Sequence, residues 1–144
     1  MKKRVLTILI VITIAFVWIH SMMPGEVSSD ESGFVFEVLA PFLKLILPDR
    51  IVTELLIRKM AHFTEYAVLG IELAFYLKTV YAVNLRNYVY LAYSGATVAF
   101  IDETIQIFSG RGPAIADVWI DIAGLVTGSA IICLISRARK SHSS

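Results

Sequence analysis

The residues best suited to chemistry lie between positions 58 and 66. Residues three or four apart on a helix share a face, so Lys59, His62 and Tyr66 form one stripe. Glu65 follows His62 at the same spacing. A histidine beside a carboxylate can accept a proton or orient a ligand. This stretch therefore predicts a polar site on one helix face.

Two later stretches repeat the pattern with carboxylates. Asp102 and Gln106 share a face, and Glu103 lies beside them. Asp117 and Asp121 share a face of the last apolar stretch. A structural charge network would need as many cations as acids, but acids exceed cations here. We therefore favour a functional polar site over a purely structural network.

Metal binding has weaker support. His20 and His62 with carboxylates include zinc-ligand types, but no HExxH or comparable motif accompanies them. Cys133 is the one cysteine, so the chain forms no internal disulfide and no thiolate cluster. We expect neither a metal nor a cofactor.

The composition indicates which solvent surrounds these residues. The chain has 144 residues, of which 57% are hydrophobic and 17% charged, and its mean hydropathy is +0.72. Soluble domains carry about 25% charged and roughly 45–50% apolar residues. The excess of apolar residues indicates an integral membrane protein. We expect membrane lipids, and no nucleic acid, as partners.

The elements that position the polar residues are predicted to be helices. A basic start, Lys2 to Arg4, precedes an apolar run that lacks a small-residue cleavage site, so we interpret this run as an uncleaved first span. The fold class is all-α, with residues 1–144 forming a single membrane domain. About 20 apolar residues cross a bilayer. On this basis we predict four transmembrane helices, over about 5–23, 57–77, 88–108 and 116–135.

The segment between the first and second spans has a different character. Residues 25–33 are rich in serine and acids and are predicted to form a polar loop. Residues 34–47 are apolar but too short to cross the hydrocarbon core. We expect a short interfacial or re-entrant helix there, kinked at Pro41.

Charge sets the orientation of the four spans. The side with both termini holds no Asp or Glu and more basic residues than the other side. These basic residues are Lys2, Lys3, Arg4, Lys78, Arg86, Arg137, Arg139 and Lys140. Cytoplasmic loops are enriched in Lys and Arg, so both termini are predicted to be cytoplasmic.

This orientation brings the polar residues of all four spans to the outer membrane face. We predict that they form one ligand-binding site, made of His20, Ser21, Arg58, Lys59, His62, Glu65, Tyr66, Asp102, Glu103, Gln106, Arg111, Asp117 and Asp121.

Four ordered motifs resemble the VanZ-like family and cover about Trp18 to Ser129. They are HSMMP from His20, RKMAHFTEY from Arg58, DETIQ from Asp102, and GR at Gly110 followed by DVWIDIAG from Asp117. The family pattern usually has Asn where this chain has Asp121. An aspartate keeps the acceptor oxygen but adds a charge and loses the amide donors.

The resemblance implies a multi-pass protein of the bacterial cytoplasmic membrane. The family is named for a member linked to resistance to teicoplanin, and the resemblance implies no settled chemical activity. The first hypothesis is binding of an anionic lipid, a lipid-linked cell-wall precursor or a lipoglycopeptide. In this hypothesis Arg58, Lys59 and Arg111 meet the phosphate.

Two alternatives stay open. The first is a membrane enzyme acting on a lipid-linked substrate, with His62 as general base oriented by Glu65 or Asp102. The second is a structural or assembly factor, in which the polar residues serve only the fold and partner contacts. Association into a homo-oligomer is compatible with each hypothesis.

Overall fold

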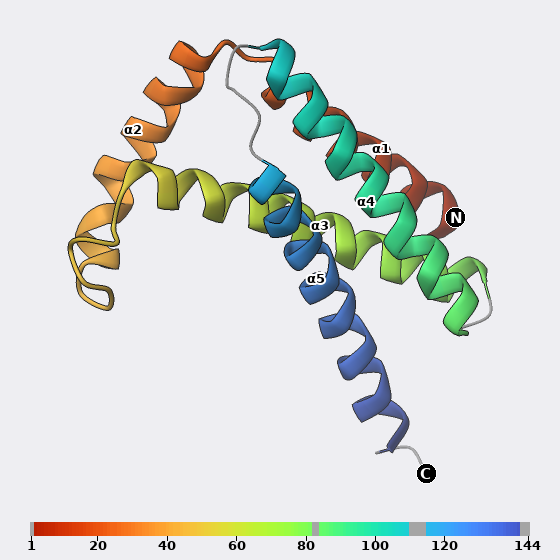
Figure 1. The fold of residues 1–144 in the computed structure, drawn as a ribbon. Coiled ribbons are helices and arrows are strands. Elements are labelled where there is room, and N and C mark those ends of the chain that lie inside the picture. Colours follow the sequence, from red (N-terminus) through yellow and green to blue (C-terminus); the bar gives the residue numbers. More distant parts are fainter. Residues whose placement is uncertain (1, 82–83, 110–114, 142–144) are drawn as a thin grey trace.

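The computed structural model describes residues 2–81, 84–109 and 115–141 and is helical (Figure 1). The helices are α1 (Lys2–Ser21), α2 (Gly25–Leu43), α3 (Glu54–Val80), α4 (Leu85–Phe108) and α5 (Ile115–Ser141). The described ranges contain no β-strand. The all-α prediction is confirmed.

Helices α1 and α4 lie side by side and run in the same direction (Figure 1). Ser21 near the end of α1 contacts Asp102 near the end of α4. Helix α3 runs the opposite way to α1, because Thr13 contacts Glu72 whereas His20 contacts Glu65. Helix α5 runs parallel to α3. The four helices therefore bring the ends of α1 and α4 to the starts of α3 and α5.

The most extensive helix contact joins α3 and α5 and depends on glycine. A Cβ atom on Gly124 would lie 2.3 Å from the carbonyl oxygen of Phe63, and one on Gly128 would lie 2.0 Å from that of Ala67. Both distances are far below van der Waals contact. Small residues four apart let membrane helices approach closely, and here they let the two backbones touch. At these two contacts the residue numbers increase together along both helices, so α5 packs parallel to α3 in a fixed register.

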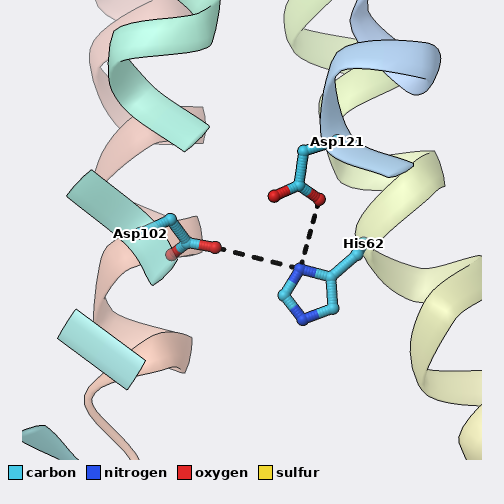
Figure 2. Close-up of side chains that lie close together, drawn as sticks. All are labelled: His62, Asp102 and Asp121. Atoms are coloured by element: carbon cyan, nitrogen blue, oxygen red, sulfur yellow. Dashed lines mark ion pairs between the residues drawn. The ribbon is translucent and has the colours of Figure 1, made fainter. Parts of the chain in front are cut away.

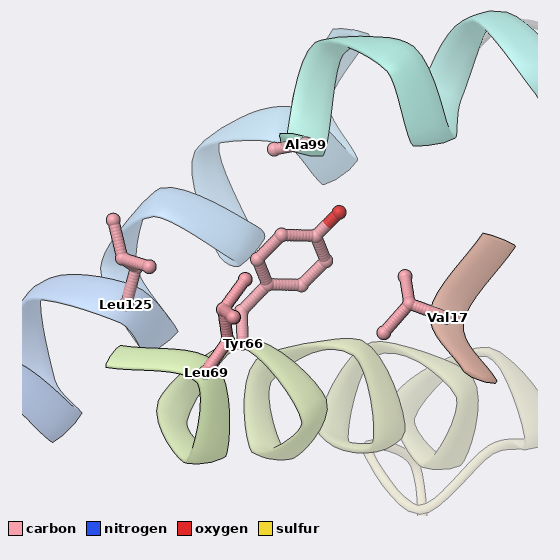
Figure 3. Close-up of a cluster of buried hydrophobic side chains, with 5 residues drawn as sticks. All are labelled: Val17, Tyr66, Leu69, Ala99 and Leu125. Atoms are coloured by element: carbon pink, nitrogen blue, oxygen red, sulfur yellow. The ribbon is translucent and has the colours of Figure 1, made fainter. Parts of the chain in front are cut away.

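The apolar core lies between all four of these helices. Tyr66 and Leu69 of α3 meet side chains of α1, α4 and α5 (Figure 3). The whole cluster is Val17, Tyr66, Leu69, Ala99 and Leu125. A second cluster continues toward the far end of α3 and comprises Ala74, Leu77, Leu91 and Ile132. The middle of the bundle is thus apolar, and its polar residues are concentrated at one end.

Two helices have the length and hydropathy of membrane spans. They are α1, with mean hydropathy 2.0, and Ala116–Ala138 of α5, with 2.1. Only 11% of the α1 window and 28% of the α5 window are buried, whereas a core helix of a soluble protein would be mostly buried. Helices α3 and α4 fall outside this criterion. The exposed apolar faces of α1 and α5 indicate a membrane protein.

The polar loop predicted over 25–33 is wrong, because α2 begins at Gly25. Pro24 immediately precedes the helix with φ −53°, and Glu26 in the first turn favours the positive end of the helix dipole. Ser32 donates a hydrogen bond to the carbonyl of Ser28 and so stays within the helix. The predicted interfacial segment over 34–47 is the second half of α2, which ends at Leu43 soon after Pro41.

Helices α3 and α4 begin three residues before the predicted spans. The side chain of Thr53 accepts a hydrogen bond from the backbone N–H of Leu56, and that of Asn84 from the N–H of Asn87. Such caps satisfy amides that have no partner within the helix. Hydropathy alone locates the apolar run but not the polar capping turn before it.

We predict that Gly128→Ala destabilises the protein by about 1–3 kcal/mol, the usual range for overpacking a tight interior. The added Cβ would clash with the Ala67 backbone and force α3 and α5 apart. The free energy of unfolding in detergent measures the effect. Gly33→Ala is the control, because a Cβ there meets nothing within 4 Å. The control should keep or raise stability, since alanine is the better helix former. Equal stability of both variants would contradict the close-contact interpretation.

Candidate functional site

The polar end of the bundle is built from four helices. Helix α3 contributes Lys59, His62, Glu65 and Tyr66 from its first half, while α1 and α4 contribute their last turns and α5 its first turns. The buried polar members of this end are Ser21, His62, Tyr66, Asp102, Glu103, Gln106, Asp117 and Asp121. We call these eight residues the polar cluster.

The centre of the polar cluster is His62 between two aspartates (Figure 2). The Nδ1 atom of His62 lies 3.5 Å from an oxygen of Asp121 and 3.8 Å from an oxygen of Asp102. His62 is 3% exposed and both aspartates are 0% exposed. Burying a carboxylate without a partner is costly, so these side chains depend on one another or on a bound group.

Asp102 accepts hydrogen bonds from side chains of α1 and α4. Ser21 donates a hydrogen bond of 2.5 Å to Oδ1 of Asp102, and the Gln106 amide donates one of 3.3 Å to Oδ2. Ser109 donates to the backbone carbonyl of Ser21 at 2.8 Å and so ties the ends of α1 and α4 together. These contacts fix the direction in which Asp102 faces His62.

Lys59 and Asp117 form a separate pair. Their Nζ and Oδ1 atoms are 2.6 Å apart, and Asp117 is buried whereas Lys59 is partly exposed. On α5, Asp117 lies one turn before Asp121, and on α3, Lys59 lies three residues before His62. The parallel register of the two helices therefore creates both pairs. Lys59 neutralises Asp117.

His20 lies at the rim of the site. Its Nε2 is 3.2 Å from a carboxylate oxygen of Glu31 on α2, and its Nδ1 is 3.6 Å from one of Glu65 on α3. Glu31 is half exposed, so this pair contacts solvent or headgroups. Glu31 was missed by sequence reasoning because its segment was taken for a loop. Glu31 lies on α2, so no spacing along a single helix links it to His20.

Glu103 and Tyr66 complete the polar cluster without hydrogen bonds. Neither carboxylate oxygen of Glu103 has a hydrogen-bond partner in the described residues, and neither does the hydroxyl of Tyr66. Both side chains are buried, at 6% and 0% exposed. Buried polar groups almost always have a partner in native proteins. The unsatisfied atoms mark a place where a bound group would be stabilised.

Arg58 lies apart from the polar cluster. Arg58 lines a small cleft of about 130 Å³ between α2 and α3, with Ser29, Ser32, Glu54 and Leu55. Arg111 lies outside the described residues. The other predicted residues meet at the same end of the bundle, with His20 and Glu65 at its rim.

The balance of charge decides what the polar cluster can accept. It contains four carboxylates, and Lys59 is already paired with one of them. Among the described residues, His62 is the other basic group that faces these carboxylates. The interior therefore suits a cation or a donor of hydrogen bonds, whereas a bare phosphate would meet repulsion there. An anion fits better at the rim, where Arg58 lies.

A comparison with family models identifies the chain. The VanZ/LLP1 model matches residues 6–136, nearly the whole sequence. The chain belongs to the VanZ/LLP1 family. The resemblance inferred from the four motifs is confirmed, and the matched region contains all of the polar cluster. Searches of curated proteins and of solved structures gave no match.

We predict that Lys59→Met destabilises this VanZ-family protein by about 2 kcal/mol, between the typical costs for exposed and fully buried pairs. The loss leaves Asp117 buried and uncompensated. Adding Asp117→Asn should restore part of the stability, with a coupling energy of about 1–2 kcal/mol in a double-mutant cycle.

The control cycle uses His20→Ala and Glu31→Ala, whose pair is more exposed. Its coupling should stay below about 1 kcal/mol. Equal coupling in the two cycles would show that burial does not strengthen the Lys59–Asp117 pair.

Proposed function

We propose that this VanZ-family protein is a multi-pass protein of the bacterial cytoplasmic membrane. In this proposal α1, α3, α4 and α5 span the bilayer, both termini are cytoplasmic, and the polar cluster lies at the outer face. There it binds the headgroup of a phosphate-bearing envelope lipid. The observation that carries the proposal is a buried polar cluster directly beside an apolar cleft.

The apolar cleft adjoins the polar cluster through Ser109. It has a volume of about 510 Å³ and is lined by Met22, Pro24, Ile105, Phe108 and Ser109. Ser109 is hydrogen-bonded to Ser21, which in turn holds Asp102. A lipid binds where an apolar surface for its chain and polar groups for its headgroup lie close together. This end of the bundle offers both.

Arg58 is the cation best placed for the phosphate. No carboxylate forms an ion pair with Arg58 within the part of the chain that the structure describes. Ser29 lies beside it in the same cleft, and its hydroxyl can donate a hydrogen bond. A guanidinium can donate two parallel hydrogen bonds to two oxygens of one phosphate. Lys59, which the sequence also suggested for this role, is instead engaged by Asp117.

The polar cluster would then bind the remainder of the headgroup. Carboxylates accept hydrogen bonds from sugar hydroxyls and amines, so a lipid-linked cell-wall precursor carries suitable groups. A lipoglycopeptide such as teicoplanin combines sugars, an amine and an acyl chain in the same way. The family name supports including it among the ligands to test.

An enzyme acting on the same lipid is the second candidate. The observation that favours it is the orientation of His62, whose Nδ1 faces two carboxylates. An imidazole oriented in this way can act as general base through its other nitrogen.

We predict that Arg58→Ala weakens binding of a phosphate-bearing lipid by about tenfold or more, as expected for a lost charge-assisted hydrogen bond. Detergent-solubilised full-length protein is titrated with a polyprenyl phosphate, phosphatidylglycerol, a neutral diacylglycerol and teicoplanin. Native mass spectrometry measures both binding and the mass of the bound molecule.

Arg137→Ala is the control, because Arg137 is exposed near the far end of α5. Its binding should match the wild type. Equal affinity for the neutral and phosphate-bearing lipids would overturn the proposal. A changed mass of the bound lipid, lost in His62→Gln, would identify the enzyme instead.

The proposed topology predicts which sites a membrane-impermeant maleimide reaches. On a Cys133→Ser background, Asp49→Cys between α2 and α3 should be labelled in intact spheroplasts. Arg86→Cys at the start of α4 should be labelled only after permeabilisation. The reverse pattern would invert the orientation, and labelling of both in intact spheroplasts would exclude α3 as a span.

A further inference from the structure

We propose that His62, Asp102 and Asp121 bind a divalent transition-metal ion, with Zn²⁺ or Mn²⁺ as the best-suited ions. The three side chains come from α3, α4 and α5, and each directs a ligand atom toward the others (Figure 2). The proposal departs from the expectation drawn from the sequence, in which no motif supported a metal. It does not depend on lipid binding.

The spacing of the ligand atoms fits one ion. One atom from each of His62, Asp102 and Asp121 lies within 4.8 Å of the other two. The His62 nitrogen is 3.5 Å and 3.8 Å from the two carboxylate oxygens. Ligands about 2.0 Å from a tetrahedral zinc are roughly 3.3 Å apart. Both His62–carboxylate distances therefore lie within about half an ångström of the tetrahedral spacing.

The hydrogen-bonding state of these atoms points to a missing partner. Neither oxygen of Asp121 accepts a hydrogen bond in the described residues, although the side chain is 0% exposed. The Nδ1 atom of His62 is likewise without a hydrogen bond. Beyond the three ligands, Tyr66 and Glu103 are also buried with unsatisfied oxygens. Four buried residues with unsatisfied polar atoms at one end of the bundle would be unusual for a closed structural network.

Neighbouring residues orient the three proposed ligands, as outer-shell residues do in metalloproteins. Ser21 and Gln106 donate to Asp102 and fix its orientation. Gly124 follows Asp121 by three residues and holds α5 against α3 at Phe63, next to His62. Outer-shell contacts of this kind orient ligands and raise metal affinity.

Charge favours a divalent ion over the alternatives. Two carboxylates and one M²⁺ ion are together neutral, which removes most of the cost of burying Asp102 and Asp121. Imidazole with carboxylates suits Zn²⁺ and Mn²⁺, whereas Ca²⁺ takes six or more oxygens and copper(I) prefers sulfur. Cys133 is hydrogen-bonded to Tyr88 near the other end of the bundle and is not available.

Three protein ligands leave a coordination position open, as in catalytic zinc sites. In the part of this inference that rests on the proposed function, that position receives an oxygen from the remainder of the lipid headgroup, while the phosphate lies at Arg58.

The test is direct metal binding by the full-length protein in detergent. Protein stripped with EDTA and free of an affinity tag is titrated with Zn²⁺, Mn²⁺ and Co²⁺ in the absence of added lipid. We expect one equivalent per chain and a visible Co²⁺ spectrum typical of nitrogen and oxygen ligands. Asp121→Asn keeps one ligand oxygen but removes a charge, and it should weaken binding by more than about tenfold.

The matched control is Asp117→Asn, which alters a buried carboxylate one turn away that faces Lys59 instead of His62. It should retain the wild-type affinity and Co²⁺ spectrum. If Asp121→Asn fails to fold by circular dichroism, Ser21→Ala replaces it and should weaken binding by about tenfold.

Absence of a saturable Co²⁺ spectrum in the wild type would overturn the metal site. An equal loss in the Asp117 and Asp121 variants would also overturn it. Lipid binding is measured separately with Arg58→Ala. One proposal can therefore fail while the experiment still tests the other.

Discussion

The close parallel contact between α3 and α5 is the constraint on which the rest of the structure depends. Gly124 meets the backbone at Phe63, and Gly128 meets it at Ala67. With the backbones in contact, the residues one turn earlier on α5 are fixed opposite the start of α3. Asp121 therefore faces His62. A bulkier residue at either glycine would move the carboxylate away from the imidazole.

The polar end then follows from the cost of burying charge. The buried acids of one helix are met mainly by polar side chains of a neighbouring helix. Asp102 on α4 is met by Ser21 from α1, and Asp117 on α5 by Lys59 from α3. The same contacts that satisfy these groups hold the helix ends together. Deeper in the bundle, one carboxylate oxygen of Glu72 accepts a hydrogen bond from Thr13 of α1.

Spacing within a helix could be predicted from the sequence, but register between helices could not. Hydropathy located α3 and α4, and the alternation of their directions brought four polar stretches to one end. The spacing along α3 suggested Lys59 and Glu65 as the neighbours of His62. The structure directs His62 toward Asp102, one of the two orienting residues that the sequence suggested, and toward Asp121, because helix packing decides which faces meet. The first half of α2 was predicted as a loop, because serines and acids also suit a solvated helix face.

The contrast between two aspartates on one helix argues against a purely structural role for the polar end. Asp117 and Asp121 are one turn apart, and both are buried. Asp117 has a lysine at 2.6 Å, which is how a protein satisfies a buried acid for stability alone. Asp121 has only an imidazole that it shares with Asp102, and its oxygens accept no hydrogen bond in the described residues. An asparagine at Asp121 would avoid the added charge at little cost in volume. A charge kept in a dry interior without a full counter-charge is a cost to the fold, and a bound cation or ligand donor would offset that cost.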